Sequence, residues 1–224
     1  MIGRMQAIEV SNLCKTFGRQ DVLNDVSLYV QHGTIMGLVG NNGSGKSVLM
    51  KCICGLVTPD QGKIMVLGQQ VGKTVDFPRQ IGALIEKPGF LPNCSGYANL
   101  RYLWEIRRAV PQSRIEEVIS IVGLDSKDKK VVGKYSLGMK QRLGIALAIL
   151  EDPEVLILDE PFNGLDRSGL NEMRQLLKKL RNAGKTILIT SHNVVDINEL
   201  CDACVEMDNG RLRELKRMAD GRYA

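Results

Sequence analysis

The sequence predicts an α/β fold in which one edge of a parallel sheet carries a phosphate-binding loop. The first observation is the segment 40–47, GNNGSGKS, which fits the pattern G-x-x-x-x-G-K-[ST]. A strand-like apolar run at 34–39 precedes it and a helix-like run at 47–53 follows it, as the pattern requires. The second observation is the continuous apolar run 155–158, VLIL, which is typical of a strand buried on both faces of a parallel sheet.

The first part of the chain combines alternating and continuous apolar patterns. Alternation, as at Ile8 and Val10, predicts antiparallel strands before the phosphate loop. A turn signal at 58–62, TPDQG, separates the first helix from the next strand. In order, we expect strands over 7–16, 22–30 and 34–39, a helix over 47–53, and strands over 63–67 and 81–85.

The middle of the chain, residues 95–150, has a helical character. The residues Ile115, Val118, Ile119 and Val122 form one apolar stripe at helical spacing, and Gly123 ends it. We expect helices over 97–108, 111–122 and 136–150, inserted as a block into an α/β core.

The α/β pattern returns at residue 151. The segment 208–210, DNG, is a strong hairpin signal near the end of the chain. We expect a strand over 155–158, a helix over 166–183, a strand over 186–190, a helix over 194–201 and a hairpin of strands over 203–207 and 211–215.

The composition of the 224 residues, 44% hydrophobic and 25% charged, is that of a globular protein with one sizeable core. The net charge of +5 is too mild to indicate a nucleic-acid partner. The longest apolar runs are far shorter than the ~18–20 residues of a membrane span, and the start, MIGRMQ, lacks the apolar stretch of a secretory signal. The sequence therefore indicates a cytosolic protein.

The six cysteines fit that compartment as free thiols. The pairs Cys52/Cys54 and Cys201/Cys204 allow a metal or redox interpretation, but only the second has a two-residue gap and no histidine accompanies it. We expect buried structural thiols.

The phosphate loop has a defined chemistry. Its glycines let the backbone N–H groups point inward, and the helix that follows adds the positive end of its dipole. Lys46 would reach the β- and γ-phosphates, and the Ser47 hydroxyl would bind Mg²⁺. The alternative is a glycine-rich turn that binds nothing, and the Lys-Ser pair between strand and helix argues against it.

A second group of candidate site residues, Asp159 and Glu160, follows the buried strand 155–158. In open parallel sheets, ligands bind at this carboxyl end of the strands. Asp159 would hold Mg²⁺ through water beside Ser47, and Glu160 would act as general base on the attacking water. An acidic loop without function is the alternative, and the phosphate loop earlier in the chain favours the functional interpretation.

A third segment, 135–142, YSLGMKQR, opens a helix at Ser136. Serine is a preferred helix cap, so simple capping explains it. A helix start with a free hydroxyl and the N–H of Gly138 is also able to bind an anion.

Taken together, these motifs resemble the nucleotide-binding subunit of an ATP-binding cassette (ABC) transporter, over about residues 5–216 and in the family's order. Segment 135–139 stands where the family signature LSGGQ lies, and 163–166, NGLD, matches the D-loop. His192 matches the switch histidine, which contacts the γ-phosphate, and 15–18, KTFG, matches the A-loop, so that Phe17 would stack on adenine.

The resemblance implies ATP and Mg²⁺ as cofactors and assigns site residues. Glu160, His192 and Lys46 would be catalytic, and Ser47, Glu86 and Asp159 would surround the metal. The nucleotide would contact Phe17, Gly40, Asn41, Asn42, Gly43, Ser44, Gly45, Lys46, Ser47, Val48, Ser136, Gly138 and Asp166.

Two departures from the family pattern matter. Glu86 replaces the glutamine of the Q-loop, and the signature is degenerate, with Leu137 for the first glycine and Met139 for the glutamine. Both features are similar to the bacitracin- and lantibiotic-resistance exporter branch. Glu86 has a simpler interpretation as a strand terminator that pairs with Lys87.

The resemblance implies a P-loop NTPase with a RecA-like core, an antiparallel β subdomain and an inserted helical subdomain. The single domain would span 5–218, with the core at 5–86 and 151–218 and the helical part at about 87–150. Two such subunits, identical or different, would close around two ATP molecules and drive a separate membrane permease from the cytoplasmic face, exporting an antimicrobial peptide or drug.

Two other functions remain to be weighed. One is a soluble ABC-type ATPase that acts on nucleic acid, which the absence of long heptads and of a basic stripe disfavours. The other is a P-loop kinase, which the signature region and His192 disfavour.

Overall fold

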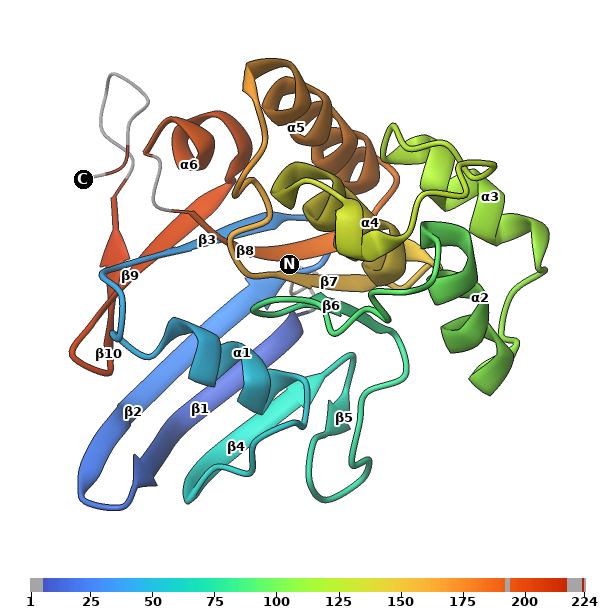
Figure 1. The fold of residues 1–224 in the computed structure, drawn as a ribbon. Coiled ribbons are helices and arrows are strands. Elements are labelled where there is room, and N and C mark those ends of the chain that lie inside the picture. Colours follow the sequence, from blue (N-terminus) through green and yellow to red (C-terminus); the bar gives the residue numbers. More distant parts are fainter. Residues whose placement is uncertain (1–5, 192–193, 217–222, 224) are drawn as a thin grey trace.

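The computed structural model describes residues 6–191, 194–216 and 223 of the chain. Its described part contains a six-stranded sheet in the order β10-β9-β3-β8-β7-β6 and a four-stranded sheet in the order β2-β1-β4-β5 (Figure 1). The larger sheet consists of β3 (Ile35–Val39), β6 (Ile81–Leu84), β7 (Val155–Leu158), β8 (Thr186–Thr190) and β9 (Ala203–Asp208), all parallel, with β10 (Arg211–Leu215) antiparallel to β9.

The smaller sheet is antiparallel. Two of its strands come before the phosphate loop in the sequence and two come after it. It contains β1 (Gln6–Phe17), β2 (Gln20–Gln31), β4 (Gln61–Val66) and the short β5 (Gln69–Gln70). Helix α1 (Lys46–Ile53) lies across this sheet in Figure 1, and Leu49, Met50 and Ile53 pack with β1 and β2 in one apolar core.

The central strand β7 separates two apolar cores. Val155 and Ile157 pack on the side of α1 and the antiparallel sheet, whereas Leu156 and Leu158 pack on the opposite side. That opposite side is covered by residues of α4 (Leu137–Ile149), α5 (Arg167–Asn182) and α6 (Val194–Leu200). Because successive side chains of a strand point to opposite faces, burial of both faces explains the unbroken run VLIL.

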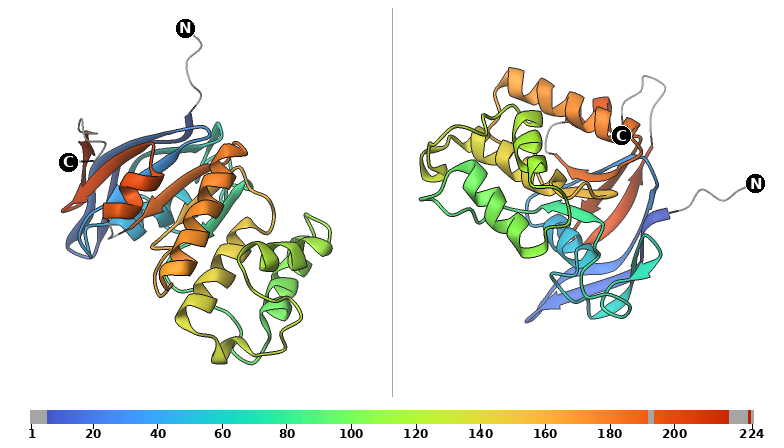
Figure 2. Two further views of the ribbon diagram at one scale, coloured as in Figure 1. Left: turned by 90° about the horizontal axis from the view of Figure 1, so that it is seen from above. Right: turned by 90° about the vertical axis from the view of Figure 1, so that its right-hand side faces the viewer.

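The helical block lies to one side of the sheets, as both views of Figure 2 show. It consists of α2 (Gly96–Arg107), α3 (Ser113–Ile121), the 3₁₀ turn η1 (Val132–Lys134) and α4. Helix α4 lies so close to β6 that a Cβ on Gly82 would stand 1.8 Å from the carbonyl oxygen of Ala148. Only glycine therefore fits at this contact.

The expected α/β class, with its antiparallel and helical additions, is confirmed, and each predicted helix and strand is present with ends that differ by a few residues. The predictions missed β5 and η1. Both segments are too short to show a periodic pattern of apolar residues. None of the helices in the described ranges combines the length and apolarity that a membrane crossing requires.

The paired cysteines are buried, as expected. Burial raises the pKa of Cys52 to about 11 and that of Cys54 to about 12, and it also raises the pKa of Cys201 and Cys204. Thiols with such high pKa values are poor nucleophiles and poor metal ligands at neutral pH.

Candidate functional site

The phosphate loop lies between β3 and α1, at the carboxyl edge of the parallel sheet. Gly45 caps α1 in the left-handed region, with φ of +111°, and a Cβ there would stand 2.8 Å from the carbonyl oxygen of Val22. The glycine is therefore required both by its backbone angle and by the close approach of β2.

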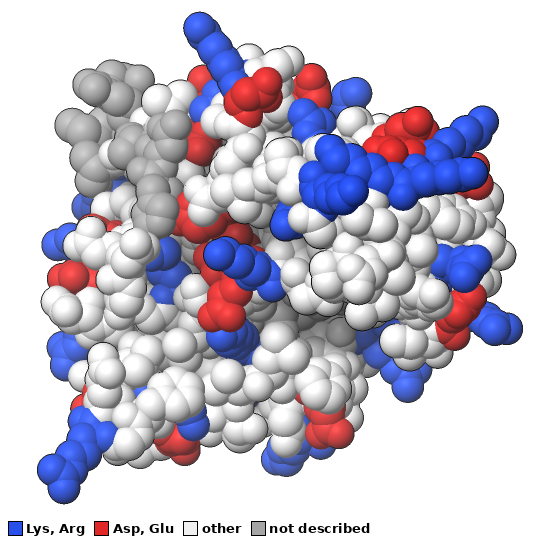
Figure 3. Space-filling view, viewed as in Figure 1, with Lys and Arg blue, Asp and Glu red and all other residues white. Residues whose placement is uncertain are grey.

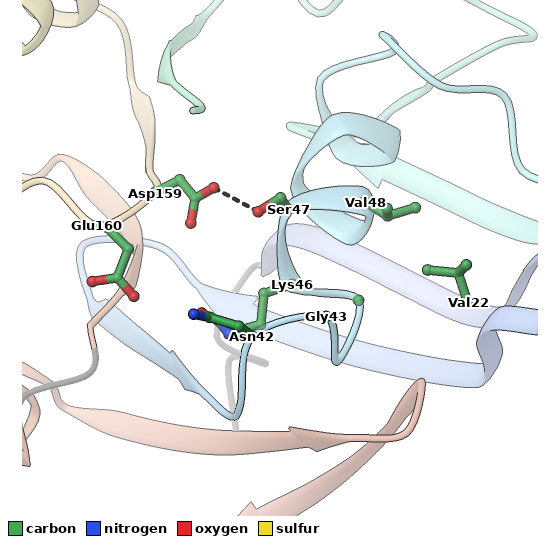
Figure 4. A pocket seen from close by; sticks show the side chains of 9 residues that line it. Val22, Asn42, Gly43, Lys46, Ser47, Val48, Asp159 and Glu160 are labelled. Atoms are coloured by element: carbon green, nitrogen blue, oxygen red, sulfur yellow. Dashed lines mark hydrogen bonds between the residues drawn. The ribbon is translucent and has the colours of Figure 1, made fainter. Parts of the chain in front are cut away.

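A cavity of about 270 Å³ opens over this loop (Figure 4). Figure 4 shows Asp159 and Glu160 at one end of it, Val22 and Val48 at the other, and Lys46 between them. Its lining residues are Val22, Asn42, Gly43, Gly45, Lys46, Ser47, Val48, Asp159 and Glu160. The cavity thus joins the two groups of residues that the sequence analysis assigned to one site.

The buried Lys46 is folded over its own loop. Its Nζ donates hydrogen bonds to the carbonyl oxygens of Gly40 at 2.8 Å and Asn41 at 2.9 Å. Burial lowers the pKa of Lys46, while the charges of Glu160 and Asp159 act in the opposite direction. The ammonium is therefore poorly solvated and close to two carboxylates, and an anionic ligand in the cavity would stabilise its charge.

The carboxylate of Asp159 is held on both oxygens. Ser47 Oγ donates to Oδ2 at 2.7 Å, and Thr190 Oγ1 donates to Oδ1 at 2.7 Å. The hydroxyl of Thr190 also accepts the backbone N–H of Glu160 at 2.8 Å. Thr190, at the end of β8, thus positions both acidic residues at the end of the adjacent strand β7.

The backbone of Glu160 turns sharply after β7. Its φ is +48°, and its carbonyl oxygen accepts a hydrogen bond from Gln141 Nε2 of α4 at 2.9 Å. A left-handed conformation at a residue other than glycine is held by surrounding contacts and is common at functional sites. The contact with Gln141 ties the helical block to the end of β7.

Thr190, Gln141 and Val22 were missed by the sequence analysis. The signal for Thr190 was available: a polar residue ends a strand directly before Ser191, and parallel strands bring their carboxyl ends to one edge. Val22 and Gln141 reach the site through tertiary packing, for which the sequence offers no local signal.

Replacing Thr190 with valine should lower ATP turnover about ten- to hundredfold, because catalytic groups displaced by even 1 Å lose that much rate. The variant also leaves the Glu160 amide without its partner, so the free energy of unfolding should fall by about 1–3 kcal/mol. Phosphate release and thermal melting measure the two effects.

The matched control is Thr186→Val at the other end of β8, where the hydroxyl accepts the N–H of Gly33 at 3.0 Å. It should lose similar stability and keep its turnover. Equal turnover in the two variants would rule out a positioning role for Thr190.

Other residues assigned by the resemblance lie outside this cavity. Ser136 and Asp166 cap α4 and α5, accepting the N–H of Met139 at 3.2 Å and of Gly169 at 2.9 Å, and Gly138 lies against the carbonyl oxygen of Gly164. The exposed ring of Phe17 has the Lys15 ammonium 5.2 Å from its centre and does not line the cavity. His192 lies outside the described residues.

Glu86 does not pair with Lys87, which corrects one of the two interpretations of this residue. Its Oε1 lies 2.5 Å from Nζ of Lys51 on α1. Lys51 is distant in sequence, so only the packing of α1 beside β6 reveals the pair. Figure 3 shows acidic side chains gathered near the centre of this face, with basic ones next to them.

The arrangement of this site is that of a P-loop ATPase. A glycine-rich loop opens a helix and carries a buried lysine, and two acidic residues stand at the end of a strand of the same sheet. The sequence profile of the family described as "ABC transporter" matches residues 23–163, and the chain belongs to this family. It is the ATP-binding and ATP-hydrolysing subunit of an ABC transporter.

Relatives with similar sequences support this identification over most of the chain. One is an uncharacterised ABC transporter ATP-binding protein, YybJ of Bacillus subtilis, 42% identical over 94% of this chain and 97% of the relative. Another is the bacitracin transport ATP-binding protein BcrA of Enterococcus faecalis, 43% identical over 92% of this chain and 68% of the relative. The lantibiotic transport ATP-binding protein SrtF of Streptococcus pyogenes is 39% identical over 87% and 84%.

Solved structures share the fold. An ATP-binding subunit of an ABC transporter aligns with a TM-score of 0.83 and 28% identity, covering 93% of this chain and 90% of that one. The ATP-binding cassette MJ0796, in a dimeric post-hydrolysis state with ADP and phosphate, aligns with a TM-score of 0.82 and 22% identity, covering 92% and 98%.

Proposed function

We propose that the cavity binds ATP with Mg²⁺ and that hydrolysis there drives a separate permease that exports an antimicrobial peptide. The observation that carries the ATP site is the 2.7 Å contact between Ser47 and Asp159, with Lys46 and Glu160 lining the same cavity. ATP phosphates would take the place of the carbonyl oxygens that Lys46 now contacts.

The oxygens of Ser47 and Asp159 suit Mg²⁺, which binds proteins through one or two oxygen side chains and completes its shell with phosphates and water. Among the described residues, no three His, Cys, Asp or Glu side chains are grouped so that they could hold a metal ion by themselves. Mg²⁺ would neutralise charge on the transferred phosphate. Glu160 would accept the proton of the attacking water.

The remaining residues would act with a second subunit. Phe17 would stack on adenine, and His192 would contact the γ-phosphate. Ser136, Gly138 and Asp166 would face the ATP of the partner subunit, which is consistent with their position outside the chain's own cavity. The pair would close when ATP binds and reopen after hydrolysis, since a ligand favours the state that it binds more tightly.

The transported substrate is proposed from the relatives. BcrA is named for bacitracin transport and SrtF for lantibiotic transport, and Glu86 and the degenerate signature are similar to that branch. The subunit would dock on the cytoplasmic face of the permease. A nucleic-acid ATPase and a kinase are disfavoured by membership of the ABC transporter family.

The test is drug resistance. Cells that express the chain together with the permease that co-purifies with it should tolerate more bacitracin or lantibiotic than cells with the permease and the Lys46→Ala variant. Equal inhibitory concentrations for both compounds would contradict the proposed substrate class. ATP turnover by the same preparations would show whether the ATPase itself is intact.

A further inference from the structure

The ion pair between Lys51 and Glu86 connects α1 to the segment that follows β6. The ammonium and carboxylate are 2.5 Å apart, and the side chains are 29% and 60% exposed. Ion pairs with this exposure are weak, since solvent and salt screen them. The contact can therefore form and break at small cost.

The backbone of Glu86 stands at the same sheet edge as the acidic pair. Leu84 of β6 lies opposite Leu158 of β7, and the N–H of Asp159 donates to the Leu84 carbonyl oxygen at 2.7 Å. Glu86 follows Leu84 by two residues, as Glu160 follows Leu158. Both glutamates have left-handed backbones, with φ of +57° and +48°. The two strands thus end in equivalent turns, each presenting a carboxylate.

Lys51 stands on the metal-facing side of α1. It follows Ser47 by four residues, so the two side chains lie on one face of the helix, about one turn or 5.4 Å apart. Ser47 Oγ already contacts Asp159. The carboxylate of Glu86 is therefore held by the residue one helical turn after Ser47, and it does not line the cavity.

We propose that Lys51 is a positioning residue that holds Glu86 away from the phosphate site until Mg²⁺ and ATP arrive, when the carboxylate moves from the ammonium to the metal shell. The inference rests on the proposed Mg²⁺ site. Before the metal binds, Asp159 and Glu160 repel a third carboxylate, and Lys51 offers it an opposite charge. A bound Mg²⁺ brings two positive charges and outcompetes the exposed ammonium.

The test is a Mg²⁺ titration of the binding of a fluorescent, non-hydrolysable ATP analogue, so that turnover plays no part. Lys51→Met should lower the Mg²⁺ concentration for half-maximal binding about two- to fivefold, the range expected for loss of a weak competing ion pair. In a Glu86→Gln background the same substitution should have no effect on this concentration. The four chains form a double-mutant cycle that isolates the coupling between the two residues.

The matched control is Lys87→Met, which removes the same charge from the residue next to Glu86 and should leave the Mg²⁺ dependence unchanged. If Lys51→Met shifted the Mg²⁺ concentration for half-maximal binding equally in the wild-type and Glu86→Gln backgrounds, its effect would come only from the loss of a positive charge, and the proposal would be overturned. The absence of any shift in the wild-type background would overturn it too. Identical Mg²⁺ dependence of wild type and Glu86→Gln would overturn the metal role of Glu86. If binding of the ATP analogue still required Lys46 in that case, the proposed ATP site itself would not be contradicted.

Discussion

Replacing Lys46 with alanine should abolish ATP hydrolysis and weaken ATP binding about 10- to 150-fold. A hydrogen bond to a charged group contributes about 1.5–3 kcal/mol, and this one would be lost from the phosphates. The Nζ of Lys46 already lies in the loop, 2.8 Å from the carbonyl oxygen of Gly40. Calorimetric titration with ATP and an assay of phosphate release measure the two effects.

The loss should not come from unfolding. The pKa of Lys46 is lowered from 10.5 by burial, so the folded chain binds this proton less tightly than the unfolded chain. In the wild type, the free energy of unfolding should therefore rise with pH as the pH approaches 10.5 from below. The Lys46→Ala variant should lack this pH-dependent rise. Lys63→Ala, an exposed lysine of β4, is the control that should retain binding. A folded Lys46→Ala protein with wild-type turnover would refute the site.

Replacing Glu160 with glutamine should slow hydrolysis by at least ~10²-fold while ATP still binds, because the amide keeps the shape but cannot accept the proton of water. Glu154→Gln, just before the opposite end of β7, is the matched control and should hydrolyse ATP normally. The Glu160 charge also raises the pKa of Lys46, so its loss should lower that pKa further.

With hydrolysis blocked, ATP should hold two Glu160→Gln subunits together. Size-exclusion chromatography with light scattering, with and without ATP and Mg²⁺, measures this. A protein that binds ATP and remains monomeric would contradict closure of the isolated subunit.

Much of the fold follows from local patterns. The unbroken run VLIL predicts a doubly buried strand, and β7 does have one core on each face. The phosphate loop is equally predictable, because its glycines and Lys46 are consecutive in sequence and need only a strand before and a helix after. Asp159 is predictable too, since it ends that strand.

Contacts between distant segments could not be predicted in this way. Thr190 acts through its place at the end of the adjacent strand, and Gln141 through the packing of α4. The partner of Glu86 was wrongly expected to be its neighbour Lys87, because sequence proximity does not reveal that α1 passes beside the end of β6. Phe17 and the residues at 136–138 stay predictions, since their roles depend on the nucleotide and on a second subunit.

The most direct measurement is phosphate release in a single turnover, with ATP limiting and the wild-type, Lys46→Ala and Glu160→Gln proteins compared at equal concentration. The site described here predicts phosphate release by the wild type, release at least ~10²-fold slower from Glu160→Gln with ATP still bound, and no release from Lys46→Ala, which should bind ATP about 10- to 150-fold more weakly than the wild type. Wild-type release from both variants would contradict the assignment of ATP hydrolysis to this cavity.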